Sequence, residues 1–441
     1  MMLIPIKPLR SLTIVLLCVH AAPAQSLQEL EAARVTLPNG WGITHVGESL
    51  PLGDLPLNMA VSPSKRLLAV TNNGQSDQSI YLIDPVRRKI LDTAVVGKAW
   101  VGLAFSSDEK SLFVSGGNDN WIIRYDLSTR RLVVRDTIPL GKPWPVKISP
   151  AGMAYDDARQ RLYVVTKENN SLYIVDVEQK KVENRFDIGG EGYTCLLSPD
   201  NSMLYVTCWG CDKVLLFNTR SKQWDGSILG GDNPNDMCLD KSGRFLFVAN
   251  ANDNSVSIIN LRTREVIETL NSALYPNAPS GSTTNSVALS EDDRVLYIAN
   301  ADNNCLAVFD VSNPGHSRSR GFIPTGWYPT CVRVSGGDIF VANGKGFSSL
   351  ANPYGPNPAR KKEIVQYIAG LFRGTLSIIR EPSEEELSVY SQVTYRNTPY
   401  SKDIELTAQG KPGNPIPIRV GDPSPIKHVF YIIKENRTYD Q

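Results

Sequence analysis

The sequence predicts an all-β protein, a seven-bladed β-propeller of four-stranded blades. Three observations support this prediction: a strand-type pattern occurs seven times, its period is nearly constant, and each copy holds enough residues for four short strands. Each copy contains an apolar strand, an Asn-rich turn and a second apolar strand that usually ends in Asp or Asn. A repeat of about 40 residues with strand patterning is typical of propellers, in which each copy forms one blade.

The copies are recognised by the starts of their second strands and the ends of their third strands. The second strands begin at Leu68, Leu112, Leu162, Leu204, Leu246, Leu296 and Ile339. The residues that end the third strands are Asp84, Asp126, Asp176, Asn218, Asn260 and Asp310, at intervals of 42, 50, 42, 42 and 50 residues. The period is therefore 42 with two short insertions. We interpret the strand-end Asp and Asn as turn residues, since such side chains accept hydrogen bonds from nearby backbone amides.

The first 24 residues have the pattern of a secretory signal peptide. Lys7 and Arg10 precede the apolar run from Leu12 to Val19, and Ala22-Pro23-Ala24 offers a small-residue cleavage site. The apolar run is too short to span a bilayer, and no other stretch of the sequence approaches the necessary length. We therefore expect a periplasmic or secreted protein with no membrane span, in which residues 25–380 form the propeller.

A propeller must close its ring, because an open sheet edge invites aggregation. The seventh copy lacks a fourth strand of its own. Residues 42–52 end in Leu50-Pro51-Leu52, which Gly53 follows. This ending resembles the fourth strand and following turn of another copy, Ile138-Pro139-Leu140-Gly141. The N-terminal segment is therefore predicted to complete the last blade.

Charge and histidine content narrow the function classes. The chain has 46 basic and 45 acidic residues and a net charge of +1, with no long run of one sign, so no nucleic acid partner is expected. After residue 24 only His45, His316 and His428 remain. Three histidines are too few for a propeller that holds haem or a copper cluster.

Six cysteines follow residue 24, in a compartment that permits disulfides. Cys195, Cys238 and Cys331 lie in the first strands of three copies, and we interpret them as buried small apolar side chains. Cys208-Trp209-Gly210-Cys211 is a CxxC motif in a hairpin. Because the chain has no second CxxC to complete a zinc site, the motif predicts a local disulfide or two free thiols.

One face of the predicted disc carries the candidate ligand site. Antiparallel alternation brings the hairpins between second and third strands to the same face as the turns between blades, and the long insertion at 344–370 interrupts the seventh such hairpin. An aromatic, Asn-rich rim near a central opening suits glycan or protein binding; the alternative is that the rings cover the blade ends as packing. The aromatic residues in these connections are Trp100, Trp121, Trp144, Tyr193, Trp209, Trp327 and Tyr328.

Beyond Arg380 the repeat stops. Residues 381–425 are predicted to be a Pro/Gly-rich linker. The run from His428 to Ile433 is then continuously apolar after its first residue, as in a buried parallel strand. A lone strand of this kind does not form a domain, so we expect residues 426–441 to be the start of a further domain whose remainder lies downstream.

The seven copies resemble the YVTN-type (YncE-like) bacterial β-propeller repeat over about residues 50–380, most closely in Tyr205-Val206-Thr207 and Phe247-Val248-Ala249-Asn250. Residues 426–441 are similar to the opening strand of a phosphoesterase of the alkaline phosphatase superfamily. Together they resemble bifunctional proteins in which the propeller precedes such a domain. The resemblance implies that Glu435 and Asn436 belong to a site for a metal ion and phosphate, with the remaining ligands beyond Gln441.

Three functions follow as hypotheses. The first is a secreted propeller module of a metal-dependent phosphoesterase, which docks substrate or covers the catalytic domain. This chain alone is then expected to be inactive, and divalent metal is needed only with the downstream domain, not by the propeller. The second is a stand-alone propeller that binds surface glycans or protein. The third is a propeller lactonase with a calcium ion in its central channel, although no singular acidic cluster in the sequence marks such a site.

Overall fold

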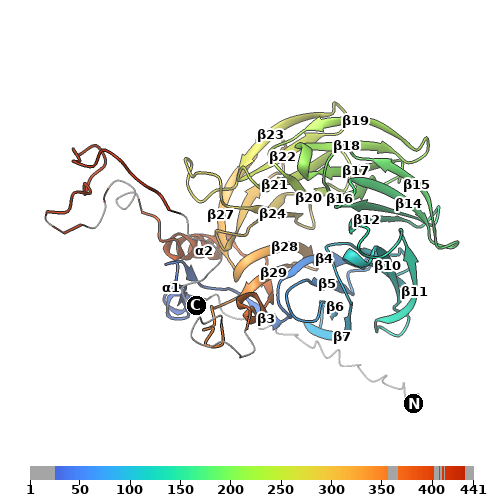
Figure 1. Cartoon of the computed structure of the whole chain (residues 1–441), viewed down its shortest axis with the longest axis horizontal. Coiled ribbons are helices and arrows are strands. Elements are labelled where there is room, and N and C mark those ends of the chain that lie inside the picture. The colour runs from blue at the N-terminus through green and yellow to red at the C-terminus, as the bar shows by residue number, and fades with distance from the viewer. Residues whose placement is uncertain (1–24, 356–365, 402–406, 408–409, 412, 433–441) are drawn as a thin grey trace, which may run out of the picture.

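Seven antiparallel sheets of four strands follow one another around a central axis, as the computed structural model shows for residues 25–355, 366–401, 407, 410–411 and 413–432 (Figure 1). Each sheet is one blade, so the predicted seven-bladed propeller of four-stranded blades is confirmed. The expected signal peptide at residues 1–24 and the implied metal ligands Glu435 and Asn436 lie outside the described residues.

The strands of each blade follow the chain from the channel outward. Blade 1 consists of β4 (Pro56–Val61), β5 (Leu68–Asn72), β6 (Ser79–Asp84) and β7 (Lys89–Val95). Blade 2 consists of β8 (Leu103–Phe105), β9 (Ser111–Ser115), β10 (Trp121–Asp126) and β11 (Val133–Pro139). Blade 3 consists of β12 (Pro150–Asp156), β13 (Arg161–Thr166), β14 (Ser171–Asp176) and β15 (Lys181–Asp187). Blades 4 and 5 consist of β16 (Gly192–Leu197), β17 (Met203–Cys208), β18 (Lys213–Asn218) and β19 (Gln223–Leu229), and of β20 (Pro234–Leu239), β21 (Phe245–Asn250), β22 (Ser255–Asn260) and β23 (Glu265–Asn271). Blade 6 consists of β24 (Thr284–Leu289), β25 (Val295–Asn300), β26 (Cys305–Asp310) and β27 (Arg318–Pro324), and blade 7 of β28 (Trp327–Ser335), β29 (Asp338–Gly346), β30 (Thr375–Arg380) and β3 (Glu48–Pro51).

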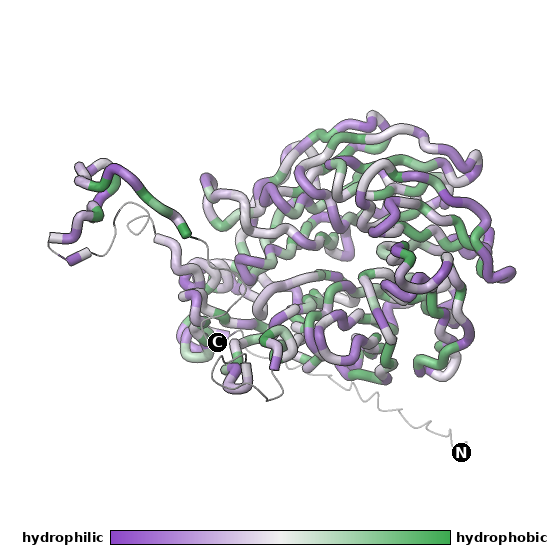
Figure 2. Tube along the Cα trace, viewed as in Figure 1, coloured by the Kyte–Doolittle hydropathy of each residue, from purple (hydrophilic) through white to green (hydrophobic). Residues whose placement is uncertain are grey.

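Burial along each strand explains the sequence pattern. The second and third strands are buried almost throughout, as in β21 and β22, because each blade is packed between two neighbours. Such strands read as continuous apolar runs. The outermost strand is covered on one face only, and β23 accordingly alternates between exposed and partly buried residues. Figure 2 shows the same arrangement, with hydrophobic residues concentrated along the inner strands.

The hydrophobic core is divided into seven clusters around the ring. Each cluster joins two neighbouring blades; Phe247 of blade 5, for example, packs in one cluster with Leu296 of blade 6. The cluster between blades 7 and 1 holds Phe340 and Leu376 together with Met59. Every blade therefore buries both of its faces only when the ring is complete.

The ring is closed by the N-terminal strand β3, which is the outermost strand of blade 7. Ser49 pairs with Ser377 and Leu50 with Leu376 in the antiparallel ladder with β30. Leu52 Nα adds a hydrogen bond of 2.9 Å to the Gly374 carbonyl. The sequence predicted this position for residues 42–52, but the fourth strand covers only residues 48–51. At the start of that range, β2 (Gly42–Ile43) pairs with β1 (Val35–Thr36) instead.

The predicted linker at 381–425 is wrong in its first part, which forms the helix α2 (Glu384–Asn397). Ser383 caps this helix: its Oγ accepts from Glu386 Nα, and the Glu386 carboxylate accepts from Ser383 Nα at 2.8 Å. Leu387, Tyr390 and Val393 are buried in the cluster between blades 6 and 7. The three glutamates at the helix start lie where negative charge stabilises a helix N-terminus.

The remaining elements are short. Helix α1 (Leu27–Ala32) contacts α2, and the 3₁₀ turns are η1 (Gly117–Asp119), η2 (Trp209–Cys211) and η3 (Ile368–Leu371). Within the described residues, no helix has the length and apolar character to cross a membrane. Residues 426–432 form no strand; they belong to a segment that projects from the propeller beyond α2 and lie on its limb that returns toward α2 (Figure 1).

We predict that Gly47→Val weakens ring closure. Gly47 precedes β3 with φ at +75°, and an added Cβ would lie 2.3 Å from the Ile378 carbonyl oxygen of β30. A β-branched residue at positive φ costs about 1–3 kcal/mol, and the collision with β30 adds to that cost. The measurement is the denaturant midpoint of unfolding.

The matched control is Gly189→Val, because Gly189 has φ at +83° and no atom within 4 Å of an added Cβ. This variant carries the backbone strain without the collision. Equal losses of stability in the two variants would contradict the role given to the β3–β30 contact.

Candidate functional site

The first strands of the seven blades line a central channel in two levels. The ladders with the second strands place one residue of each blade at each level. The upper level consists of Asn58, Gly102, Gly152, Thr194, Asp236, Ser286 and Cys331. The lower level consists of Ala60, Ala104, Ala154, Leu196, Cys238, Ala288 and Arg333. The lower level thus combines four alanines with a single arginine, for which the small side chains leave room.

Arg333 fills the channel and bonds to three other blades, and we call the set Asn58, Asp236, Ser286 and Arg333 the channel plug. Arg333 Nη1 donates to Asp236 Oδ2 at 2.8 Å and to Ser286 Oγ at 3.0 Å, and Nη2 donates to Asn58 Oδ1 at 3.1 Å. Nε donates to the Met59 carbonyl at 3.0 Å. The plug therefore ties blades 5, 6, 7 and 1 to one another.

The plug contains a half-buried ion pair, in which Arg333 and Asp236 keep 22% and 15% of their side-chain surface exposed. Burial opposes the charge of Arg333, but the neighbouring carboxylate of Asp236 outweighs it and raises the pKa of the guanidinium. Burial also raises the pKa of the Cys331 thiol, which keeps this residue protonated beside the pair. Nε, Nη1 and Nη2 of Arg333 all donate hydrogen bonds within the protein. The plug therefore has a structural role and is not a free binding site for an anion.

Above the plug, the channel opens on the face that carries the hairpins between second and third strands, which we call the hairpin face. Here the Gly210 amide of a hairpin donates to the Glu191 carbonyl of an inter-blade turn at 3.0 Å, which confirms that both kinds of connection share this face. A cavity of about 300 Å³ lies there, the mouth cavity. Its lining residues are Trp100, Lys167, Glu191, Gly192, Tyr193, Trp209, Asn235, Ala251, Asn252, Thr283 and Asn285.

The plug separates this cavity from the opposite face. The space between Tyr193, Asn285 and the upper level of the channel is only about 20 Å³, roughly that of one water molecule. Below the plug lies a wider funnel of about 750 Å³, lined by the lower level and by the first-to-second strand turns. A ligand in the mouth cavity therefore enters and leaves by the hairpin face.

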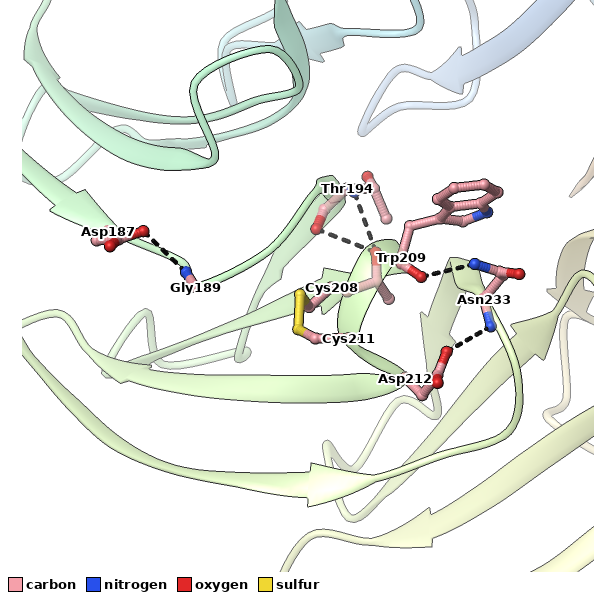
Figure 3. The surroundings of a disulfide bond; sticks show 9 residues. Asp187, Gly189, Thr194, Cys208, Trp209, Cys211, Asp212 and Asn233 are labelled. Atoms are coloured by element: carbon pink, nitrogen blue, oxygen red, sulfur yellow. Dashed lines mark hydrogen bonds between the residues drawn. A yellow bond between two sulfur atoms is a disulfide. The ribbon is translucent and has the colours of Figure 1, made fainter.

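Trp209 is held in the mouth cavity by the CxxC hairpin, in which Cys208 and Cys211 form a disulfide (Figure 3). This outcome is one of the two that the motif predicted. The Trp209 carbonyl accepts from Asn233 Nδ2 at 2.8 Å, and the indole ring points away from the sulfur atoms. The disulfide packs on the inter-blade turn that precedes its own blade, since a Cβ on Gly190 would lie 3.0 Å from Cys208 Sγ.

Trp100 forms another wall of the cavity together with a paired lysine. Lys167 Nζ lies 5.3 Å from the centre of the Trp100 ring and 3.3 Å from Glu191 Oε1. The Trp100 indole N–H is buried and finds no hydrogen-bond partner among the described residues. Tyr193 completes the aromatic lining, and burial raises the pKa of its phenol.

Trp327 and Tyr328 lie in a neighbouring cluster rather than in the mouth cavity. With Phe372 they surround the ammonium of Lys345, whose Nζ is 5.4, 4.3 and 5.8 Å from the three ring centres. Burial lowers the pKa of Lys345. The aromatic rings stabilise this half-buried cation, so they serve a contact within the chain.

Trp121 and Trp144 line neither the mouth cavity nor the funnel below the plug. Trp121 begins β10 and its ring lies against Gly116. Trp144 is 55% exposed, and Lys147 Nζ lies 5.7 Å from its ring centre. Of the seven aromatic residues predicted for the face, the structure brings three into one cavity, two into an adjacent cluster and two to separate places.

Sequence reasoning missed the channel plug. Asp236 and Arg333 stand where other copies carry small or uncharged residues, and this departure from the repeat was the available signal. Among the described residues, no three His, Cys, Asp or Glu side chains lie together in a way that would hold a metal ion.

Comparisons with known proteins support the fold. A family model described as Lactonase, 7-bladed beta-propeller matches residues 194–359, which is less than half of the chain. No curated protein matches the sequence. The matched residues cover blades 4 to 6 and the start of blade 7, which are therefore similar to this family.

Solved structures show the same architecture at low identity. Kuenenia stuttgartiensis hydrazine synthase is 17% identical with a TM-score of 0.55, over 68% of this chain and 95% of that one. U3-55K is 13% identical and the RRP9 WD40 repeats are 12% identical, each with a TM-score of 0.59 over 76% of this chain and 98% of theirs. Likeness at these identities concerns the fold alone.

We predict that Arg333→Met lowers the free energy of unfolding by about 1–3 kcal/mol, because it leaves the half-buried Asp236 carboxylate without its partner. The double variant Arg333→Met with Asp236→Leu removes both charges and is expected to recover a large part of that loss. Denaturant unfolding of both variants is the measurement. A double variant less stable than Arg333→Met would contradict the assignment of a structural ion pair.

Proposed function

We propose that this chain is a ligand-binding propeller that recognises a glycan in the mouth cavity. The observation that carries the proposal is the meeting of Trp100, Tyr193 and Trp209 with amide side chains in one concave space. A sugar ring presents apolar C–H faces and hydroxyl edges, so its recognition needs aromatic surfaces together with hydrogen-bonding groups. The mouth cavity offers both, the amides being those of Asn235, Asn252 and Asn285.

Shape and charge favour a glycan over a protein partner. Stable protein interfaces bury about 1,200–2,000 Å² of surface, whereas this site is recessed and small. Its one cation, Lys167, is paired with Glu191 at 3.3 Å, so the cavity presents no unbalanced charge to a ligand. An uncharged, ring-containing ligand fits these features best.

The lactonase-type match raises ester opening as another activity of such a site. Opening a lactone requires a group that activates water, and the calcium version requires oxygen ligands that converge on one point. Among the described residues that line the mouth cavity, Glu191 is the only carboxylate, and it is engaged by Lys167. We therefore propose binding rather than catalysis for this cavity.

A periplasmic or secreted location is part of the proposal. It rests on the signal-peptide pattern of residues 1–24 and on the disulfide between Cys208 and Cys211, since disulfides persist in oxidising compartments. Glycans of cell surfaces are available to a protein in such a place.

We predict that Trp209→Ala and Trp100→Ala each weaken glycan binding by about tenfold or more, because each removes an aromatic wall of the mouth cavity. The measurement is isothermal titration with chito- and cello-oligosaccharides of one to six units. The matched control is Trp144→Ala, which removes a tryptophan from the same face outside the cavity. The control is expected to bind like the unaltered protein.

Two results would contradict the proposal. One is that no sugar of either series binds the unaltered protein. The other is that Trp144→Ala and Trp209→Ala weaken binding equally, which would place the ligand elsewhere on the face. The thermal midpoint of each variant separates a lost contact from a lost fold.

A second candidate function is that of an accessory module of a metal-dependent phosphoesterase. The observation that favours it is a run of exposed apolar side chains, with Val429, Phe430, Tyr431 and Ile432 between 81% and 90% exposed. Contiguous apolar residues of this kind usually pack against a partner. In this proposal the run is the first strand of a catalytic domain, which would hold divalent metal with Glu435 and Asn436 among its ligands.

We predict metal-dependent phosphatase activity in a protein that includes the sequence following codon 441 of the gene. The extended protein is expected to hydrolyse p-nitrophenyl phosphate, and EDTA or the substitution Glu435→Ala is expected to abolish this activity. A protein of residues 25–441 alone is expected to be inactive. Glu384→Ala, an exposed helix residue, is the matched control and should retain activity. An extended protein that is folded, metal-loaded and inactive on phosphoesters would contradict this second candidate.

A further inference from the structure

A second cavity lies beside the mouth cavity on the hairpin face. It has a volume of about 540 Å³ and lies between blades 1, 2 and 3, and we call it the adjacent cavity. Hairpins of blades 1 and 2 and the turn between them form most of its walls. Its lining residues are Gly74, Gln75, Ser76, Asp77, Gln78, Val95, Val96, Gly97, Lys98, Ala99, Trp100, Gly117, Asn118, Ser149, Lys167 and Glu168.

The two cavities share Trp100 and Lys167. With Lys167 Nζ 5.3 Å from the centre of the Trp100 ring, these side chains form a common wall with one cavity on each side. The Trp100 indole N–H is buried and unbonded within the described part of the chain. Buried donors are nearly always satisfied in folded proteins, so this group is available to a ligand that reaches the wall.

The lining of the adjacent cavity is polar and rigid. Gln78 Oε1 accepts from Ala99 Nα, and Ser149 Oγ donates to Asn118 Oδ1 at 2.6 Å, which fixes neighbouring turns to one another. Lys98 faces Asp119 at 3.8 Å, so its charge is balanced. Within the described residues the side-chain amide of Gln75 and Asn118 Nδ2 have no hydrogen-bond partner, and both side chains are exposed, whereas the Gln75 backbone N–H donates to Asp54 Oδ2. The cavity therefore offers side-chain amides, together with the carboxylates of Asp77 and Glu168, to the hydroxyls of a ligand.

We propose that the ligand of this face is an oligosaccharide that occupies both cavities and crosses the Trp100–Lys167 wall. This inference rests on the proposed glycan function of the mouth cavity and adds the length of the ligand. The mouth cavity alone is at the lower limit of ligand sites, about 300 Å³ in a range of about 300–1,000 Å³, and accommodates a small unit only. The adjacent cavity receives the next units of the same chain, and the Trp100 N–H bonds to the ligand at the crossing.

The test is the dependence of affinity on ligand length, measured by isothermal titration with chito- and cello-oligosaccharides of one to six units. Affinity is expected to rise at least tenfold between one unit and four units and to change little from there to six. Affinity that does not change with length overturns the two-cavity inference but leaves the proposed function intact. Absence of binding by every member of both series overturns both.

Variants of the adjacent cavity separate the two sites. Gln75→Ala combined with Asn118→Ala is expected to weaken binding of the four-unit sugar about tenfold while leaving the one-unit sugar unchanged. Asn118→Trp, which fills the cavity, is expected to do the same. Trp209→Ala, in contrast, weakens every length. Unchanged binding of the four-unit sugar by both adjacent-cavity variants, with normal thermal midpoints, overturns the inference.

Discussion

The structure depends on the antiparallel pairing of β3 with β30. Without that pairing, blade 7 would lack its outer strand and the cluster that joins it to blade 1 would lose Leu50 and Leu52. Each of the seven hydrophobic clusters is shared between neighbouring blades, so an opening at one joint exposes apolar surface on both sides of it. The plug spans the joint between blades 7 and 1, because Arg333 of blade 7 bonds to Asn58 of blade 1.

Most of the propeller could be predicted from the sequence, because the repeat gives the positions of the strands. The antiparallel order of the strands then determines which connections lie on the same face. The strand-end residues act as expected; Asp84 Oδ1, for instance, accepts from Arg87 Nα at 2.9 Å. Helix α2 was missed although Ser383 and Glu386 form a capping box and Leu387 and Tyr390 have helical spacing. Three consecutive glutamates obscured that pattern. The helix is stabilised by packing on β27, a contact that local sequence does not encode.

The candidate site was predictable only in part, since the position of a residue in a turn does not fix the direction of its side chain. Trp209 reaches the mouth cavity because a disulfide and the Asn233 contact hold its hairpin, whereas Trp144 remains exposed. The plug was beyond local reasoning because Asp236 and Arg333 belong to different blades. Only the closed ring and the register of the first strands bring these charges to 2.8 Å.

The place of the closing strand has a consequence for how the protein is made. Ser49 leaves the ribosome early, but its partner Ser377 is synthesised only when nearly the whole propeller has been translated. The ring thus cannot close during most of translation, and the long sequence separation makes closure slow. The contact that completes the fold is therefore also the last to become possible, and until then the apolar faces of the first and last blades wait for their partners.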